Sequence, residues 1–391
     1  MKNVSAFRFT VMAAAVAASS QTFALEEFFA TPGTRAMGMA GAYVAHASDS
    51  SAIWYNPAAL DLTRNFSDAT IDYGDFIKRK SEDEIDVDDE GYVDWFETET
   101  NIKYVAFSGS GFGVAFFQPY NFSSSVVEED FLGNQSLQQV NTTYQELKFA
   151  FATDLNEYVS VGAGFDLINQ ELDCPDCSSF GSESSAGFGY SLGTIGRWTL
   201  NKGTPNPVTV KLGANYRSEA SMDDLVLLDF EQDVVPSRPA SLSYGASVGV
   251  PFMVGSLPVY VAGSLHLESV SYGETQRSWY SNGQPVFDSF EFEEDRTAMG
   301  LEVSFLVNDD LDLYVRMGSA STEVTDDGNG AYDEEPYSTG TESSTLGFGA
   351  RFNELVFDLA MESRTIEESD FYSDIKDEDE DLISMSVSFT F

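Results

Sequence analysis

The last nine residues of the chain alternate strictly between apolar and small polar side chains. Ile383, Met385, Val387, Phe389 and Phe391 share one parity, and the serines and the threonine between them share the other. Successive side chains of a β-strand point to opposite faces, so the segment predicts a strand with one apolar and one hydroxyl-rich face. Such a strand suits the closing strand of a membrane β-barrel, where lipid-facing and lumen-facing residues alternate. An edge strand of a secreted β-sandwich would alternate in the same way.

The N-terminus has the pattern of a secretory signal peptide. Lys2 and Arg8 precede an apolar run over residues 11–18, and Thr22 and Ala24 place small residues at the two cleavage-site positions. We therefore expect residues 1–24 to be removed on export. Beyond them the sequence has no run of about 18 or more apolar residues, the length that a membrane helix needs. Any membrane span must then be made by strands, which excludes a helical channel.

Composition agrees with an exported β-protein. The chain holds 31 Gly, 18 Tyr and 31 Phe but only two Cys, so its core is not built on disulfides. Its formal net charge of −44 at pH 7 argues against nucleic acid as a partner, because the phosphate backbone is itself anionic. The same charge indicates a soluble surface that attracts cations.

Alternating segments recur along the chain and predict fourteen strands. Short connections, such as 154–157 and 307–310, take turns with long acidic ones. Outer-membrane barrels have an even strand number, short periplasmic turns and long outer loops, whereas a sandwich has no reason for this regular asymmetry. We therefore predict an all-β fold, a transmembrane antiparallel β-barrel over residues 63–391. The expected strands are 66–77, 101–109, 111–120, 140–153, 157–171, 184–199, 206–219, 239–250, 257–272, 293–307, 311–324, 340–352, 354–368 and 379–391.

Seven long loops follow from this arrangement, all on the side opposite both termini and therefore facing outward. Their acidic runs, such as 82–84 and 377–381, are most simply solvated loop tips. A divalent-cation bridge to anionic lipid headgroups is the alternative, although no EF-hand spacing indicates a Ca²⁺ site. The expected loops are 78–100, 121–139, 172–183, 220–238, 273–292, 325–339 and 369–378.

Strand parity also divides side chains between lipid and lumen. The predicted lipid-facing residues are Val208, Val210, Leu212, Leu311, Leu313, Val315, Leu346, Phe348, Leu355, Phe357, Leu359 and Met361. Their neighbours point inward and carry both signs of charge, with His266, Glu146, Asp166, Glu302, Asp312, Asp358 and Glu362 among them. These charges are expected to pair with one another and with a plug. The alternative is a headgroup-binding position, for which the candidates are Lys148, Lys211, Arg217, Arg316 and Arg351.

Residues 25–62, between the signal peptide and the first strand, do not read as a strand. Small residues at Ala36, Gly38 and 40–42 would let a compact coil or short helix pass close to a wall. A barrel of about fourteen strands encloses more space than its own side chains fill. The segment is therefore predicted to fold inside the barrel as an N-terminal plug.

This segment resembles the N-terminal hatch of the FadL/TodX family of outer-membrane transport proteins. The resemblance is carried by residues 33–42 (GTRAMGMAGA), by Asp49 and by residues 54–60 (WYNPAAL). The family's fourteen-stranded barrel with seven outer loops agrees with the strand count reached above from the residues alone. The resemblance implies hatch or gate roles for Arg35, Trp54, Tyr55, Asn56, Pro57 and Ala58. Related barrels with the same hatch act as scaffolds in protein secretion, so a scaffold stays open as an alternative, as does a general porin.

The resemblance implies passive uptake of hydrophobic compounds, either long-chain fatty acids or aromatic hydrocarbons, across the outer membrane of a Gram-negative bacterium. In the family, ligands are captured at an apolar groove of the outer loops and leave sideways at a kink in the third strand. Gly113 and Pro119 are the corresponding candidates in this chain, although an ordinary strand end is the alternative. Capture candidates lie in the fourth outer loop, where a helix packed on its neighbours is the alternative: Met222, Leu225, Val226, Leu227, Leu228 and Phe230.

Cys174 and Cys177, in the third outer loop, predict a structural disulfide. The context lacks the βαβ unit of a redox motif and the further ligands of a zinc site. Neither His46 nor His266 has a nucleophile at a recognisable spacing, so the chain is not expected to be an enzyme or to bind a cofactor or metal. The expected partners are a hydrophobic small molecule, outer-membrane lipid and lipopolysaccharide, and the barrel-assembly machinery during biogenesis.

Overall fold

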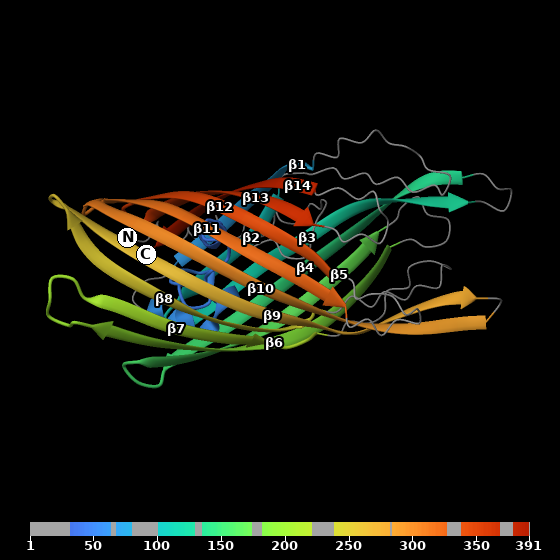
Figure 1. The fold of residues 1–391 in the computed structure, drawn as a ribbon, viewed down its shortest axis with the longest axis horizontal. Helices are drawn as coiled ribbons and strands as arrows, with labels where there is room; N and C mark the ends of the chain where they lie inside the picture. The colour runs from blue at the N-terminus through green and yellow to red at the C-terminus, as the bar shows by residue number, and fades with distance from the viewer. Residues whose placement is uncertain are drawn as a thin grey trace, which may run out of the picture.

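The chain forms one closed barrel of fourteen antiparallel strands (Figure 1). The structure is a computed structural model, and it describes residues 32–63, 68–79, 101–129, 135–173, 182–220, 238–281, 284–326, 338–367 and 378–390. Each strand pairs with its neighbours in sequence, and β1 closes the sheet against β14. The predicted fold class and strand number are confirmed. The strands are β1 Asp68–Arg79, β2 Asn101–Gly109, β3 Phe112–Glu129, β4 Gln135–Asp154, β5 Val159–Asp173, β6 Ser182–Leu200, β7 Val208–Arg217, β8 Ala240–Val254, β9 Leu257–Ser281, β10 Gln284–Asn308, β11 Leu311–Asp326, β12 Ser338–Phe352, β13 Leu355–Glu367 and β14 Glu378–Thr390.

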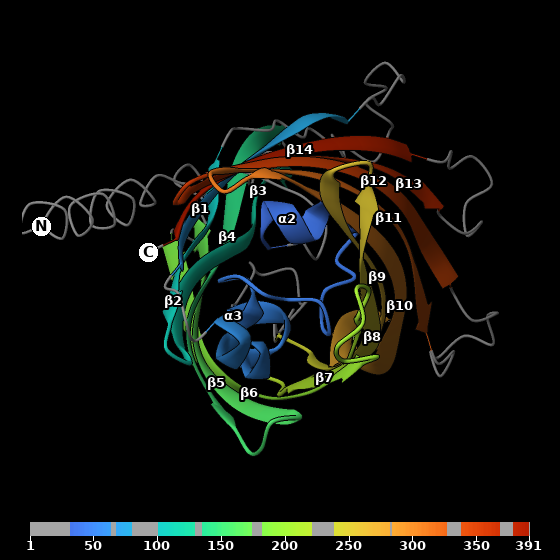
Figure 2. The same cartoon turned by 90° about the vertical axis from the view of Figure 1, so that its left-hand side faces the viewer.

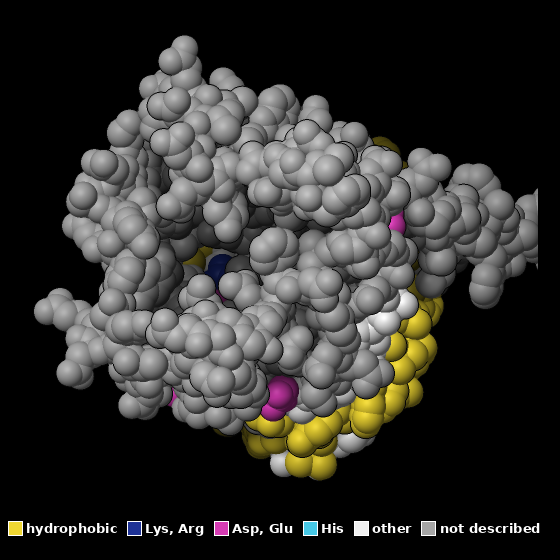
Figure 3. Space-filling model, turned by 90° about the vertical axis from the view of Figure 1, so that its right-hand side faces the viewer, with side chains coloured by type: hydrophobic (Ala, Val, Ile, Leu, Met, Phe, Trp, Pro, Cys, Tyr) yellow, Lys and Arg dark blue, Asp and Glu magenta, His cyan; other side chains and the backbone are white. Residues whose placement is uncertain are grey.

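The outer face of the barrel is apolar where strand parity predicted it. In β14, Met385 and Val387 are 48% and 46% exposed, whereas Ser386 between them is only 5% exposed. Most of the predicted lipid-facing residues are likewise exposed, including Leu212, Leu313, Leu346, Phe348, Leu355, Phe357 and Met361. The remaining ones, Val208, Val210, Leu311, Val315 and Leu359, are half-buried. Figure 3 shows hydrophobic side chains covering the visible flank of the barrel. A continuous apolar surface of this extent requires a lipid environment.

Among the described residues, no helix is long enough and apolar enough to cross a membrane.

Two predicted outer loops are instead largely strand. Where loop 121–139 was expected, β3 runs on to Glu129 and β4 already begins at Gln135. Where loop 273–292 was expected, β9 and β10 pair as far as Ser281↔Gln284. Both hairpins extend away from the end at which β14 terminates (Figure 1). Strands can pair through their backbones without an apolar face. Alternation of apolar and polar residues therefore predicts only the part of a strand that has lipid on one side.

Residues 32–63, called the plug below, lie inside the barrel (Figure 2). The plug contains α2 (Thr34–Met37), α3 (Ala52–Tyr55) and the 3-10 helix η1 (Pro57–Thr63). Its Met39, Tyr43, Ile53 and Leu60 side chains are fully buried in one cluster with wall residues, among them Phe117. The described lumen is therefore filled by a folded segment at this level.

Several of the wall glycines that the structure describes face the plug at positions where a side chain would collide with it. A Cβ atom at Gly162 would lie 2.3 Å from the Ala58 nitrogen, and one at Gly213 would lie 2.5 Å from the Val44 carbonyl oxygen. Only glycine allows such a close approach of two backbones. The set, called the socket glycines below, is Gly113, Gly162, Gly193, Gly213, Gly300 and Gly318. They belong to β3, β5, β6, β7, β10 and β11, so the wall contacts the plug closely on several sides.

Candidate functional site

A buried ion cluster fixes the plug to the wall. Arg35 in α2 donates to both oxygens of Glu302 on β10, at 2.8 and 2.9 Å, and to Asp49 at 3.3 Å. Arg316 on β11 donates to the same Glu302 carboxylate at 2.6 Å and to Asp358 on β13. Arg316, Glu302 and Asp358 are at most 7% exposed. Buried charges are tolerated only when they are paired, so Arg316 is positioned as an anchor of the plug.

Two further cations from the wall lie close to the ring of Trp54 in α3. The Arg217 guanidinium is 4.7 Å and the Lys148 ammonium 5.5 Å from the centroid of the Trp54 ring, distances at which a cation interacts with an aromatic face. Lys148 pairs with Asp166 at 2.9 Å, and Arg217 pairs with Glu268 at 2.8 Å. Both cations therefore contact the plug while their charges are balanced by the wall.

Arg238 links the base of the fourth outer loop to the same wall. Its guanidinium donates to Glu146 at 3.0 Å and to Asp166 at 2.7 Å, and all three side chains are buried. Its backbone forms an isolated β-bridge with Ala220, on the other side of the loop. Ala220 and Arg238 are thus held together, and Arg238 is bonded to the barrel interior.

The Asn-Pro-Ala triplet of the plug has a structural role. The Asn56 amide donates to the carbonyl oxygens of Val44 and of Thr194 on β6, both at 3.0 Å. Its amide oxygen accepts from the Ala58 nitrogen at 3.1 Å, a local turn that Asn side chains favour. The side chain of Asn56 is fully buried. Asn56, Pro57 and Ala58 therefore hold the chain against the wall at Gly162 and Gly193.

The outer cavity, on the side of the plug that faces the outer loops, has a volume of about 30 Å³. Trp54, Tyr55, Arg217, His266, Glu268 and Arg296 line it. Figure 3 shows a hollow at this end of the barrel, with hydrophobic and Lys or Arg side chains at its floor. The arrangement combines aromatic surface with paired charges.

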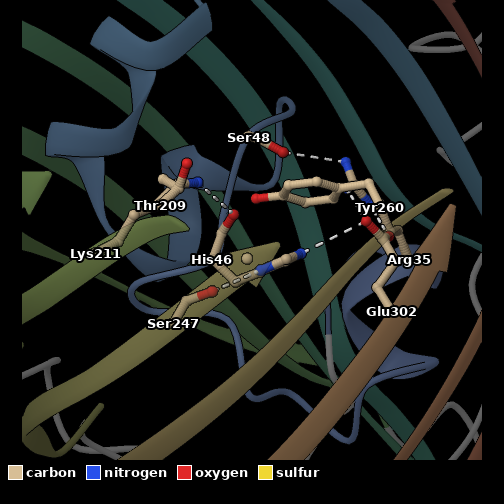
Figure 4. A pocket seen from close by; sticks show the side chains of 9 residues that line it. Arg35, His46, Ser48, Thr209, Lys211, Ser247, Tyr260 and Glu302 are labelled. Carbon is tan, nitrogen blue, oxygen red and sulfur yellow. Dashed lines mark hydrogen bonds and ion pairs between the residues drawn. The ribbon is translucent and has the colours of Figure 1, made fainter. Parts of the chain in front are cut away.

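The inner cavity, between the plug and the wall nearer the short connections, has a volume of about 80 Å³. Arg35, His46, Lys211, Ser247, Tyr260 and Glu302 line it (Figure 4). Apart from Gly249, every one of its lining residues is polar. The predicted headgroup candidates are therefore separated: Lys211 faces this cavity and Arg217 the outer one, while Arg351 pairs with Asp312 and is partly exposed.

The third strand loses its one-to-one pairing with β4 at Pro119. The ladder is regular up to Phe117↔Glu146 and resumes at Tyr120↔Tyr144, so two residues of β3 oppose one of β4. This is the pattern of a β-bulge. Gly113 lies elsewhere, against the plug, where a Cβ atom would be 2.5 Å from the Ile53 side chain.

Several predicted features lie outside the described residues. They are the signal peptide 1–24, the capture set Met222, Leu225, Val226, Leu227, Leu228 and Phe230, and the disulfide of Cys174 with Cys177. Their roles remain predictions.

Sequence reasoning missed some of the charged residues that complete the lumen. Glu268, Glu294 and Arg296 were not singled out, although they share the inward parity of His266 and Glu302, and that parity would have found them. Arg238 stands outside any strand, so no periodicity assigns its direction. Its partners follow only from the fold.

No family model and no curated protein sequence matches the chain. Solved structures do match it. The TodX deltaS2S3 mutant, a monoaromatic hydrocarbon channel, aligns with a TM-score of 0.52 and 14% identity over 94% of this chain and 99% of that one. The Pseudomonas putida toluene transporter TodX aligns with a TM-score of 0.45 and 12% identity over 95% and 99% of the two chains. A Pseudomonas aeruginosa FadL homologue aligns with a TM-score of 0.43 and 13% identity over 93% and 98%. Because the identities are this low, the likeness establishes the fold, that of a FadL/TodX-like barrel.

Proposed function

We propose that this barrel is an outer-membrane channel that admits hydrophobic small molecules by energy-independent diffusion. The observation that carries the proposal is the plug: a folded N-terminal segment, anchored by Arg35 and gripped by the socket glycines, fills the lumen of a closed FadL/TodX-like barrel. A general porin needs an open aqueous lumen. A plugged lumen instead suits solutes that bind in apolar sites and leave without crossing water.

The proposed path begins at the outer loops, whose apolar set in the fourth loop serves as the capture surface. It continues to the outer cavity, where Trp54 and Tyr55 offer aromatic surface. The close backbone contacts at the socket glycines oppose passage straight through the plug. A sideways exit next to Pro119 is supported by the bulge there, because the ladder with β4 is locally disrupted.

The proposed substrates are neutral aromatic or alkane-like compounds and, as the alternative, long-chain fatty acids. Four of the five headgroup candidates pair with a wall carboxylate within 2.9 Å: Lys148, Arg217, Arg316 and Arg351. Charges that are already balanced attract a carboxylate weakly. The acidic outer surface would also repel fatty-acid carboxylates. Both points favour neutral substrates.

Native mass spectrometry of the full chain, extracted in mild detergent from the outer membrane, tests this proposal. We expect a hydrophobic molecule bound in about one-to-one ratio, and we expect Trp54→Ala to lose it. The matched control is Trp198→Ala, which removes the same side chain from the exposed outer face of β6 and should retain the molecule. An empty barrel that carries a tightly bound protein would instead favour the scaffold.

A further inference from the structure

Lys211 is a cation in the lumen that the wall does not neutralise by contact. Its ammonium lies 3.5 Å from the carbonyl oxygen of His46, at the limit of a hydrogen bond. None of the carboxylates that the structure describes forms an ion pair with it. Its nearest acidic neighbour in the cavity lining, Glu302, already accepts three hydrogen bonds, two from Arg35 and one from Arg316. The Lys211 charge is therefore directed to the inner cavity without a partner of its own.

His46 presents a second unused group to the same cavity. Its ring is 5% exposed, and its Nδ1 atom is 3.1 Å from the hydroxyl of Ser247 on β8. Its Nε2 atom forms no hydrogen bond with the described residues; the Glu302 carboxylate, at 3.7 Å, is within ion-pair distance but too far for a hydrogen bond (Figure 4). Buried ring nitrogens are nearly always satisfied. A buried nitrogen that is unsatisfied and lines a polar cavity calls for a ligand or water there.

We propose that the inner cavity binds a compact oxyanion of the carboxylate or phosphate class, held by the ammonium of Lys211 and by Nε2–H of His46. The cavity volume of about 80 Å³ is several times the roughly 10–15 Å³ that one water molecule needs, so a single carboxylate or phosphate group fits. The hydroxyls of Thr209 and Tyr260 line the same space and add hydrogen-bonding groups. The site lies on the opposite side of the plug from the outer cavity and is distinct from it.

Charge balance predicts that this oxyanion binds together with a proton. Two cations line the cavity, Arg35 and Lys211, and a third, Arg316, pairs with the lining residue Glu302. Three carboxylates match them: Glu302, Asp49 and Asp358. Burial lowers the pKa of His46 below its ordinary value, although the Glu302 carboxylate opposes this shift. An anion beside Nε2 raises that pKa again. Affinity should therefore rise as pH falls, by up to about tenfold per pH unit between the free and bound pKa values of His46.

The groups that face His46 come from each element packed against it. They are Glu302 from β10, Lys211 from β7, Ser247 from β8, and Arg35 and Tyr43 from the plug. Of these, the Lys211 ammonium forms no ion pair among the described residues, and His46 Nε2 forms no hydrogen bond, with Glu302 at ion-pair distance.

The test uses the imidazole signals of the full chain in detergent micelles. The sequence has only two histidines, so histidine-selective isotope labelling gives two ring signals, and the His46→Gln variant identifies the one from His46. Acetate, inorganic phosphate and octanoate are titrated separately at several pH values. We expect saturable shifts of the His46 signal and a rise in its pKa. Saturation by acetate and octanoate alone assigns the carboxylate class, and saturation by phosphate alone assigns the phosphate class.

Variants of two lysines separate a site from general charge effects. Lys211→Met should weaken binding about tenfold or more, since a hydrogen bond to a charged group contributes about 1.5–3 kcal/mol. Lys202→Met, at an exposed position between β6 and β7, removes the same charge and should bind like the wild type. If Lys211→Met does not fold, Lys211→Gln replaces it. The proposal is overturned if no anion gives a saturable shift, or if the Lys211 variant titrates like the wild type.

The anion site rests on different residues from the proposed transport, so either one can be disproved without the other. The titration measures no transport, and the native mass spectrometry compares tryptophan variants that leave Lys211 and His46 intact. A barrel that carries hydrophobic compounds without an anion site, or the reverse, would be recognised from the two measurements together.

Discussion

Arg316 lies at the centre of the ion cluster that holds the plug, with Glu302 on one side and Asp358 on the other. Arg316→Met would leave Asp358 without this partner and Glu302 with Arg35 as its remaining guanidinium partner. Breaking a buried ion pair from one side costs about 3–5 kcal/mol. We therefore expect a large loss of unfolding free energy, measured by urea titration of the folded barrel in lipid vesicles.

Arg351→Met is the matched control for this residue. Arg351 also pairs with a wall carboxylate, Asp312, but its side chain is 44% exposed. Solvent screens a pair whose cation is exposed, so we expect a smaller loss of unfolding free energy than for Arg316→Met. Equal losses in the two variants would show that Arg316 is not an anchor.

His46 makes stability depend on pH in a defined window. Its pKa is lowered in the folded barrel by burial, whereas the unfolded chain has an ordinary value of about 6.5. As pH falls below about 6.5, the unfolded chain takes up the proton first, so folding becomes less favourable. We expect the wild type to lose more unfolding free energy than His46→Gln between pH 7.5 and 5.

The measurement is the same urea titration, made in a buffer without small carboxylates or phosphate. Unfolded carboxylates titrate mainly below this window, at about pH 4. Parallel pH curves for the two chains would mean that His46 is not held neutral by burial.

The socket glycines determine how closely the plug packs against the barrel wall. Gly162→Ala would place a Cβ atom 2.3 Å from the backbone nitrogen of Ala58, which forces the plug or β5 to shift. Gly263→Ala on β9 is the matched control, because nothing lies within 4 Å of its added Cβ atom. We expect a raised ion conductance of single barrels in planar bilayers for Gly162→Ala only. If Gly162→Ala conducts like Gly263→Ala, the close contacts do not seal the lumen.

The bulge in β3 is the element that tests the sideways exit. Deletion of Pro119 should restore one-to-one pairing with β4, because two residues of β3 now oppose one. We expect severalfold slower uptake of a labelled hydrophobic compound, with folding intact because the ladder gains regular pairing. Uptake at the wild-type rate would remove the bulge from the path.

At the scale of the whole molecule, most of the barrel could be predicted because its strands must place apolar side chains against lipid. A strand between lipid and lumen must alternate, and this period located all fourteen strands and the inward direction of Arg316 and Lys148. It failed for the far ends of β9 and β10, where no apolar face is required. Strand parity also predicts whether a side chain points to lipid or to the lumen, but it does not predict which residues the side chain contacts. The pairing of Arg238 with Glu146 and Asp166, and the contact of Gly162 with Ala58, depend on strand order and depth together.

The kind of solute that crosses the barrel distinguishes a plugged hydrophobic channel from an aqueous pore. The most direct measurement places the purified full chain in vesicles and compares, in one preparation, the flux of a labelled aromatic hydrocarbon with that of a small hydrophilic sugar. A plugged hydrophobic channel should speed the hydrocarbon over protein-free vesicles and leave the sugar flux unchanged. Faster sugar flux without any gain for the hydrocarbon would contradict the proposal and identify an aqueous pore.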